Sequence, residues 1–378
     1  MKVLFLVNNY PDDKNPYAGI FVHNQIKVLL AEGIDACVLY FDFRSIRRVR
    51  KWGMSQYEYN GVKVYRYAIP CGPVRKLYIQ LLKKNAVKAY KKVCKMEDGI
   101  ELLHAHFTDM GIPAAKIKEK FGIKYILTEH SSTLLQEEIC VEEKKLIKEA
   151  YENADCILAV GTTLKQNMRK YTTKEIEVVP NILPNKFRVM RDIQKESDKY
   201  AFVSVVGTLT KDKKVDLLVQ AFAELSKRYE NIVLKICGCG NLMDEVKNMV
   251  SDIGLEEKVE FLGVIKNDKL PEILNACDCF VLPSIVETFG VVYIEAAGCG
   301  LPVIAANSGG TLDIVEDSNG VRIPYVNVEE LVDAMEKMII YRERYLPDKI
   351  SEEIHKKFGE KAFVKKIEKV YAKVLMEA

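Results

Sequence analysis

Short apolar runs alternate with longer amphipathic segments along the whole chain. In the first half, the runs expected to be buried strands are Lys2–Asn8, Ile34–Phe41, Ile100–Ala105, Ile123–Thr128, Asp155–Val160 and Ile176–Val179. In the second half they are Ala201–Val206, Ile232–Cys237, Val259–Leu262, Cys279–Leu282 and Val303–Ala306. Most of the intervening segments show helical spacing, so the pattern predicts an α/β protein with parallel sheets.

Two segments of the first half have a different pattern. Tyr57–Tyr67 alternates around Asn60-Gly61, which is typical of a β-hairpin turn. Leu134–Tyr151 is rich in charged residues, and we expect it to form one long helix.

The length of 378 residues favours two domains of roughly 180 residues each. Pro180–Pro184 interrupts the pattern, and we interpret the polar stretch from there to Lys199 as an interdomain linker. We place the domains at residues 1–185 and 186–354. A C-terminal segment, 355–378, has apolar residues at helical spacing and is expected to be a helix.

Composition and cysteine usage are typical of a globular protein of a reducing compartment. The first apolar run, Val3–Val7, is too short for a signal peptide or a membrane span, so we expect a cytoplasmic or peripheral membrane protein. Most of the ten cysteines lie in apolar runs, as reduced thiols do. Cys237/Cys239 and Cys277/Cys279 are each separated by one residue, which is too close for usual zinc sites, and we expect no metal.

Positive charge is concentrated between residues 44 and 95. This segment holds 15 basic residues and one acidic residue, Glu58. It contains Arg44–Trp52, which mixes cations with apolar residues, and a predicted helix, Pro73–Met96. Three interpretations remain open: a surface for anionic lipid head groups, a nucleic-acid surface, or a solvated basic face. We favour the lipid surface and expect no nucleic acid.

The most informative stretch is Phe280–Ile304. A buried strand leads through a loop that carries Glu287 into a helix that carries Glu295, and a second strand follows. Ligands of α/β proteins bind where a strand ends and a helix begins, because free N–H groups there favour an anion. Carboxylates accept hydrogen bonds from hydroxyl groups. The stretch therefore offers amides for phosphate and two carboxylates for a polyol, although a crossover helix with incidental glutamates would look similar.

Other loops at the same edge carry candidate residues. Gly19 follows the first strand, where a glycine permits close approach of a ligand or makes a tight turn. Lys213 lies in a strand-to-helix loop, where it could hold a phosphate or be one more surface lysine. His106 and His130 both fall at the C-terminal ends of strands. Two histidines at one edge favour a functional role for His130, whereas for His106 a functional and a structural role remain equally open.

With these motifs, the chain resembles a retaining glycosyltransferase of family 4, over nearly its whole length. The most specific part is Leu282-Pro-Ser-x-x-Glu287-x-Phe289-Gly290-x-x-x-x-Glu295-Ala-x-x-Cys299-Gly300-x-Pro302, followed by Gly309-Gly310. Supporting motifs are Val206-Gly207 through Lys213, Gly238-x-Gly240, Phe261-x-Gly263, Pro180-Asn181 and Thr128-Glu129-His130-Ser131.

The resemblance implies the GT-B fold, in which two Rossmann-like, doubly wound parallel-sheet domains face each other across a cleft. It also implies that the C-terminal helix crosses back to the first domain. The first domain would bind the acceptor and the second the nucleotide-sugar donor.

The resemblance also implies roles for individual residues. Lys213 would bind the donor diphosphate, Glu287 the sugar hydroxyls and Glu295 the ribose. His130 would contact the donor sugar near the reaction centre, and His106 would lie on the acceptor side. The remaining donor-binding residues would be Gly19, Gly207, Thr208, Val264, Ile265, Phe289, Gly290, Val291 and Val292. Many relatives have Arg where this chain has Thr208, so Lys213 would carry more of the phosphate charge.

The expected reaction transfers a sugar to a hydroxyl acceptor with retention of configuration. No Asp-x-Asp pair occurs in the chain, so we expect neither a metal-held diphosphate nor another cofactor. Family frequency favours a UDP-sugar, and the acceptor is expected to be a saccharide or a lipid-linked saccharide at the inner face of the plasma membrane. The alternatives are a sugar-nucleotide epimerase of the same fold, a dehydrogenase, and a non-catalytic binder of nucleotide or nucleic acid. The third glycine of a dinucleotide fingerprint would fall at Met243, which argues against the dehydrogenase.

Overall fold

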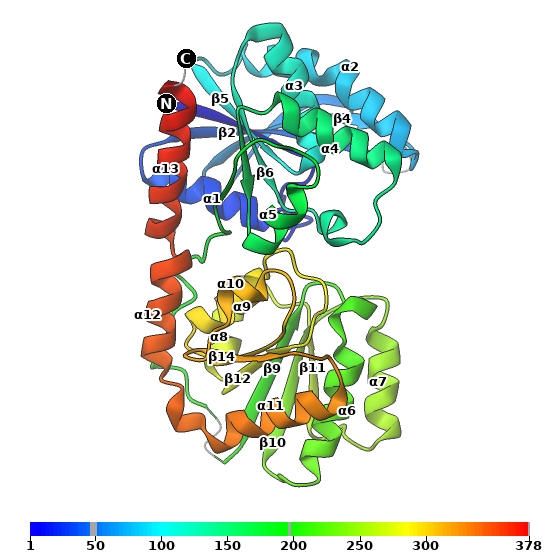
Figure 1. Ribbon diagram of the computed structural model, residues 1–378, viewed down its shortest axis with the longest axis vertical. Coiled ribbons are helices and arrows are strands. Elements are labelled where there is room, and N and C mark those ends of the chain that lie inside the picture. The colour runs from blue at the N-terminus through cyan, green and yellow to red at the C-terminus, as the bar shows by residue number, and fades with distance from the viewer. Residues whose placement is uncertain (46–50, 196–197, 377–378) are drawn as a thin grey trace. The chain divides into compact units, whose positions relative to one another are not determined.

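The computed structural model describes residues 1–45, 51–195 and 198–376 and divides the chain into two compact units (Figure 1). Unit 1 comprises Met1–Ile182 and the chain from Phe363 onward, and unit 2 comprises Leu183–Ala362. Arg44–Trp52 of the basic segment is described only in part, because residues 46–50 lie outside the described ranges. Within those ranges, no helix is both long enough and apolar enough to cross a lipid bilayer.

Unit 1 is built on a sheet with the strand order β3-β4-β2-β1-β5-β6-β7-β8. The strands are β1 (Lys2–Val7), β2 (Asp35–Arg44), β3 (Gly53–Tyr59), β4 (Val62–Pro70), β5 (Ile100–His106), β6 (Tyr125–Glu129), β7 (Cys156–Ala159) and β8 (Ile176–Val178). The sheet is parallel except at its edge, where β3 is antiparallel to β4 and confirms the predicted hairpin. Asn60 and Gly61 both have positive φ and form the predicted hairpin turn that reverses the chain there.

Helices cover both faces of this sheet. In Figure 1, α2 (Arg75–Val93), α3 (Thr108–Phe121) and α4 (Val141–Asn153) lie side by side on one face. The core beneath the other face includes residues of α1 (Ile20–Ala31) and of α13 (Glu360–Met376). The part of α13 from Phe363 onward therefore completes unit 1, and Ile367 and Tyr371 are fully buried there.

The prediction of one helix over Leu134–Tyr151 is wrong. A short 3-10 helix, η1 (Ser132–Leu135), precedes α4, which begins only at Val141. The Ser131 hydroxyl accepts a hydrogen bond from the Thr133 amide and starts the 3-10 turn, while Glu142 and Glu143 favour a second helix start at Val141. The remaining helix of unit 1 is α5 (Thr162–Met168).

Unit 2 is built on a parallel sheet with the order β11-β10-β9-β12-β13-β14. Its strands are β9 (Tyr200–Val206), β10 (Ile232–Gly238), β11 (Val259–Gly263), β12 (Cys279–Leu282), β13 (Val303–Ala306) and β14 (Gly320–Ile323). Its helices are α6 (Val215–Ser226), α7 (Met243–Asp252), α8 (Leu270–Asn275), α9 (Val291–Gly298), α10 (Thr311–Ile314), α11 (Val328–Ile340) and α12 (Pro347–Phe358). Short 3-10 segments are η2 (Lys211–Lys213) and η3 (Arg342–Arg344).

The stretch interpreted as a linker is partly built into unit 2. Leu183 and Phe187 are fully buried, and the Leu183 amide donates to the Phe358 carbonyl at the end of α12. Leu183 and Phe187 pack against Gly298 at the end of α9, so this part of the stretch belongs to the core of unit 2.

The strand orders locate the ligand-binding edge of each unit. Successive strands are added in one direction and then in the other, and the reversal falls between β1 and β5 in unit 1 and between β9 and β12 in unit 2. Ligands of open α/β sheets bind outside the carboxyl ends of the strands at such a reversal. The loops after β9 and β12 carry Lys213 and Glu287. The loop after β1 leads to Gly19, and β5 ends at His106.

Candidate active site

The ligand-binding edge of unit 2 is centred on an ion pair between Lys213 and Glu287. The Lys213 ammonium donates to Glu287 Oε1 at 2.6 Å, although the two residues are 74 positions apart. Glu287 is buried, and the Lys213 side chain is about one-quarter exposed. The Ile285 amide donates to the Asp212 carbonyl at 2.9 Å, so the two loops are joined by their backbones as well.

Gly309 and Gly310 pack against the backbone of Glu287 and position it. The Gly310 amide donates to the Glu287 carbonyl at 3.0 Å. A Cβ at Gly309 would lie 1.7 Å from the same carbonyl oxygen, and Gly309 has φ of +51°, so only glycine fits. The sequence motif contains this pair, but its supporting role was not predicted, because it depends on the approach of two loops.

The start of α9 lies directly after Glu287. Gly290 caps this helix in a left-handed conformation, with φ of +92°. The first amides of a helix, here those of Val291 and Val292, have no acceptor within the helix and favour an anion. Both residues are partly exposed. Phe289 is different, because its side chain is buried and its ring packs against Phe358, with the centroids 5.6 Å apart.

Glu295 lies in the second turn of α9 and is buried. Burial raises the pKa of its carboxyl to about 8, against the opposing effects of the Lys186 charge and of a hydrogen bond with Asn267. Lys186 also donates to Asn267 and to Asp268, the latter at 2.8 Å. Lys186 was not singled out in the sequence, because it lies in the segment interpreted as a linker.

The other predicted donor residues lie on surface loops of unit 2. Val264 and Ile265 lie between β11 and Asn267, and the Val264 side chain is exposed. Gly207 and Thr208 are exposed after β9. Their loop packs on Gly240, where a Cβ would lie 2.5 Å from the Leu209 nitrogen, and the Leu209 amide donates to the Cys239 carbonyl at 2.7 Å.

The ligand-binding edge of unit 1 carries a stack of histidine rings. His106 Nδ1 and His130 Nε2 share a hydrogen bond of 2.9 Å, and their rings are stacked with centroids 5.1 Å apart. His104 stacks on His106 from the other side and is hydrogen-bonded to Thr128 and to Tyr371 of α13. The two predicted histidines are therefore brought together, and His104 is a third member that the sequence did not single out.

These imidazoles are neutral at physiological pH. Burial lowers the pKa of His130 and of His104 to about 3, and it also lowers the pKa of His106 well below its usual range. A neutral imidazole can donate one hydrogen bond and accept another without adding charge to the site.

A small cavity of about 120 Å³ adjoins this stack and is lined by residues that include Gly19, Phe21, His106 and Phe107. Gly19 has φ of +63°, and a Cβ there would lie 2.6 Å from the Asn9 carbonyl oxygen. His106 Nε2 is buried and has no hydrogen-bond partner among the described residues. Gly19, His106 and His130 thus belong to unit 1, and all other predicted site residues belong to unit 2.

Across the described ranges, no group of three or more His, Cys, Asp or Glu side chains is arranged to hold a metal ion. The edge of unit 2 instead carries the Lys213–Glu287 ion pair, the buried carboxyl group of Glu295 and the N-terminus of α9.

Two parallel-sheet units with this edge chemistry define a glycosyltransferase of the GT-B fold. Residues 18–184 match the family described as Glycosyltransferase Family 4, and residues 186–362 match Glycosyl transferases group 1. The chain belongs to glycosyltransferase family 4. Membership of this family makes the protein an enzyme and disfavours the non-catalytic and dehydrogenase alternatives.

Individual relatives agree with this assignment. The chain is 30% identical to an uncharacterized glycosyltransferase of Methanocaldococcus jannaschii, over 76% of this chain and 79% of the relative. It is 25% identical to the GPI3 subunit of the phosphatidylinositol N-acetylglucosaminyltransferase of Saccharomyces cerevisiae, over 65% of this chain and 56% of that protein. The solved structure of Anabaena HepE with UDP and glucose has the same fold, with a TM-score of 0.74, 17% identity, and coverage of 99% of this chain and 100% of HepE.

Replacing Glu295 by Gln should remove a pH dependence from the stability of the protein. The carboxyl ionises near pH 4.5 in ordinary surroundings and near pH 8 in the fold, so between these values unfolding releases a proton. The wild type therefore loses stability as pH rises through this window, by up to about 1.4 kcal/mol per pH unit. The stability of Glu295→Gln should therefore increase relative to that of the wild type as pH rises through the same window.

Urea unfolding across the window measures this difference. Glu257→Gln, on the exposed surface of the same unit, serves as the control and should follow the wild type. Parallel pH profiles for Glu295→Gln and the wild type would show that Glu295 is not held protonated by the fold.

Proposed function

We propose that this enzyme transfers a sugar from a nucleotide-diphosphate-sugar to a hydroxyl acceptor, with retention of configuration and without a metal ion. The observation that carries the proposal is the Lys213–Glu287 ion pair at the ligand-binding edge of unit 2, beside the N-terminus of α9. A cation and a row of amides suit a diphosphate, and a carboxylate suits sugar hydroxyls.

Donor binding would separate Lys213 from Glu287, and each would then contact the donor. The diphosphate would take Glu287's place beside Lys213, and Glu287 would then accept hydrogen bonds from the sugar. The amides of Gly290, Val291 and Val292 would bind the phosphate and sugar oxygens, and Glu295 the ribose. HepE of Anabaena has been solved with UDP and glucose, which supports a UDP-sugar as the donor.

The proposed chemistry needs no protein nucleophile. The acceptor oxygen bonds to the anomeric carbon on the leaving-group face while the bond from that carbon to the phosphate oxygen breaks. The departing phosphate oxygen takes the acceptor proton, so the products are a glycoside and a nucleoside diphosphate. Lys213 and the start of α9 stabilise the charge that develops on the diphosphate. His130, held neutral by burial, would donate a hydrogen bond to the donor sugar.

Glu287→Gln should abolish most of the transfer while preserving the fold. The amide keeps the shape of the side chain but removes the charge that the sugar hydroxyls would contact, and we expect sugar release from the preferred donor to fall about 100-fold. A thermal-shift panel of nucleoside diphosphates and their sugars first selects that donor, because a bound ligand stabilises the fold.

The matched control is Glu316→Gln, which removes an exposed carboxylate paired with Lys357 in the same unit. It should release sugar like the wild type. If Glu287→Gln retains wild-type turnover, Glu287 has no role in binding the transferred sugar.

We further propose that the acceptor is linked to a lipid and that α2 contacts an anionic membrane, at the inner face of the plasma membrane. Lys76, Gln80, Lys84, Lys88 and Lys91 are exposed and lie three or four positions apart, which places them on one face of α2. Val74 and Leu77 are exposed near its start. The name of the yeast relative, a phosphatidylinositol N-acetylglucosaminyltransferase, supports a lipid-linked acceptor.

Not all of the basic segment is available to a membrane. Arg75 is paired with Asp109 and Glu143, Lys83 with Glu149, and Lys63 with Glu97. The proposed surface is therefore the exposed lysine stripe of α2.

The double substitution Lys84→Glu/Lys88→Glu should release the protein from anionic vesicles. Each lysine near an anionic surface contributes about 1 kcal/mol, so reversing two charges should nearly eliminate flotation with phosphatidylserine vesicles at physiological salt. The control Lys365→Glu/Lys369→Glu changes two exposed lysines of α13. Equal binding of the wild type to neutral vesicles, or an unaffected double variant, would contradict the membrane role of α2.

A further inference from the structure

A second, larger cavity opens in unit 1 next to the histidine stack. Its volume is about 410 Å³, within the range of pockets that hold small molecules. Phe107 lines both this cavity and the smaller one beside Gly19 and His106. Arg75, Asp109 and Glu143 are its charged lining residues, and the neutral ones include Asn8, Phe107 and Thr108.

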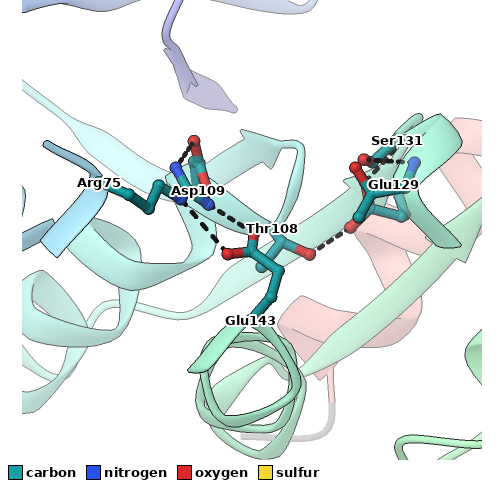
Figure 2. A network of polar contacts seen from close by, with 7 residues as sticks. Arg75, Thr108, Asp109, Glu129, Ser131 and Glu143 are labelled. Atoms are coloured by element: carbon teal, nitrogen blue, oxygen red, sulfur yellow. Dashed lines mark hydrogen bonds and ion pairs between the residues drawn. The ribbon is translucent and has the colours of Figure 1, made fainter. Parts of the chain in front are cut away.

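At this cavity, one arginine links the N-terminal turns of three helices by hydrogen bonds (Figure 2). Arg75, the first residue of α2, donates to both oxygens of Asp109 in α3, at 2.7 and 2.5 Å. It also donates to both oxygens of Glu143 in α4, at 3.3 and 2.5 Å. A guanidinium that bridges two carboxylates holds them in a defined geometry. Each carboxylate retains lone pairs that can accept further hydrogen bonds.

Hydrogen bonds to Glu129 hold another part of the cavity wall in place, at Thr108 and Ser131. The Thr108 hydroxyl donates to the buried carboxylate of Glu129 at 2.5 Å, and the amides of His130 and Ser131 donate to its other oxygen at 2.9 Å (Figure 2). Phe107 has φ of +70°, a strained value for a residue with a side chain. Its ring lies 5.1 Å from that of His130. The wall is thus continuous with the histidine that we place at the reaction centre.

The charge of the lining limits what the cavity can bind. Two carboxylates against one guanidinium leave one negative charge in excess, and the other lining residues are neutral. Fixed carboxylates beside amide, hydroxyl and aromatic groups suit the hydroxyls and apolar face of a sugar ring. An acidic sugar or a phosphate would be repelled by the excess charge.

We propose that this cavity binds the acceptor saccharide, and that it takes a neutral or amino sugar and rejects an acidic or phosphorylated one. Asp109 and Glu143 accept hydrogen bonds from its hydroxyls, and Arg75 positions both. This inference rests on the proposed function, and it specifies the terminal sugar of the acceptor rather than the lipid that carries it.

Ligand-observed NMR on the full chain tests the inference. The probes are methyl glycosides of a neutral hexose, of a 2-amino hexose and of a hexuronic acid, together with a hexose 6-phosphate. The neutral and amino sugars should bind at millimolar to tens of millimolar concentration. The uronic acid and the phosphate should bind at least about tenfold more weakly.

The variant Glu143→Gln provides the decisive comparison. It should weaken binding of the neutral glycoside about tenfold and reduce the discrimination against the uronic acid, because the excess negative charge is gone. The matched control is Glu149→Gln, which lies on the same helix and also pairs with α2, through Lys83 at 2.7 Å, but does not line the cavity. It should bind the probes like the wild type.

Three results would overturn the inference: absence of binding by the neutral and amino sugars, binding of the uronic acid as tight as that of the neutral sugar, or equal losses in Glu143→Gln and Glu149→Gln. The thermal-shift panel with nucleoside diphosphates separates this failure from a failure of the proposed function. Nucleotide binding without selective sugar binding refutes only the acceptor pocket, and absent nucleotide binding refutes the donor site.

Discussion

The ion pair between Lys213 and Glu287 is the interaction on which the proposed donor site depends. Each residue lies in a loop that follows one of two neighbouring strands, β9 and β12, and each partly removes the other from water. Removing one partner from such a pair would leave a poorly solvated charge, so both are constrained together. Gly309 and Gly310 then fix the backbone of Glu287, and the start of α9 adds its amides to the same edge. This edge of unit 2 is thus arranged for a ligand that brings its own negative charge.

The two units differ in the electrostatics of their ligand-binding edges. Unit 2 presents a lysine and helix amides, which suit the charge that develops on a leaving diphosphate. Unit 1 presents neutral imidazoles and a cavity with excess negative charge, which suit sugar hydroxyls. This contrast supports our proposal that unit 2 binds the nucleotide and unit 1 the acceptor. Arg75 is already paired with two carboxylates, so the membrane surface that we propose is limited to the exposed lysine stripe of α2.

Much of the fold could be predicted from the sequence, because strands buried on both faces are continuous apolar runs. The short β14 was missed, since Arg322 interrupts its run and only pairing with β13 defines it. Glu287 and Lys213 could be singled out from their positions after strands, but their pairing required the fold. The arginine bridge could not be predicted, because Arg75 lies 34 and 68 positions from its partners. The raised pKa of Glu295 likewise depends on burial that no local pattern reveals.

The most direct test of the account compares how Lys213 contributes to the binding of a nucleoside diphosphate and of the corresponding monophosphate. Isothermal titration of both into the wild type and Lys213→Met, which keeps most of the length of the side chain but not its charge, isolates the proposed contact to the second phosphate. The account predicts that the affinity for the diphosphate falls about tenfold or more while that for the monophosphate changes little. Unchanged affinity of Lys213→Met for the diphosphate would contradict it.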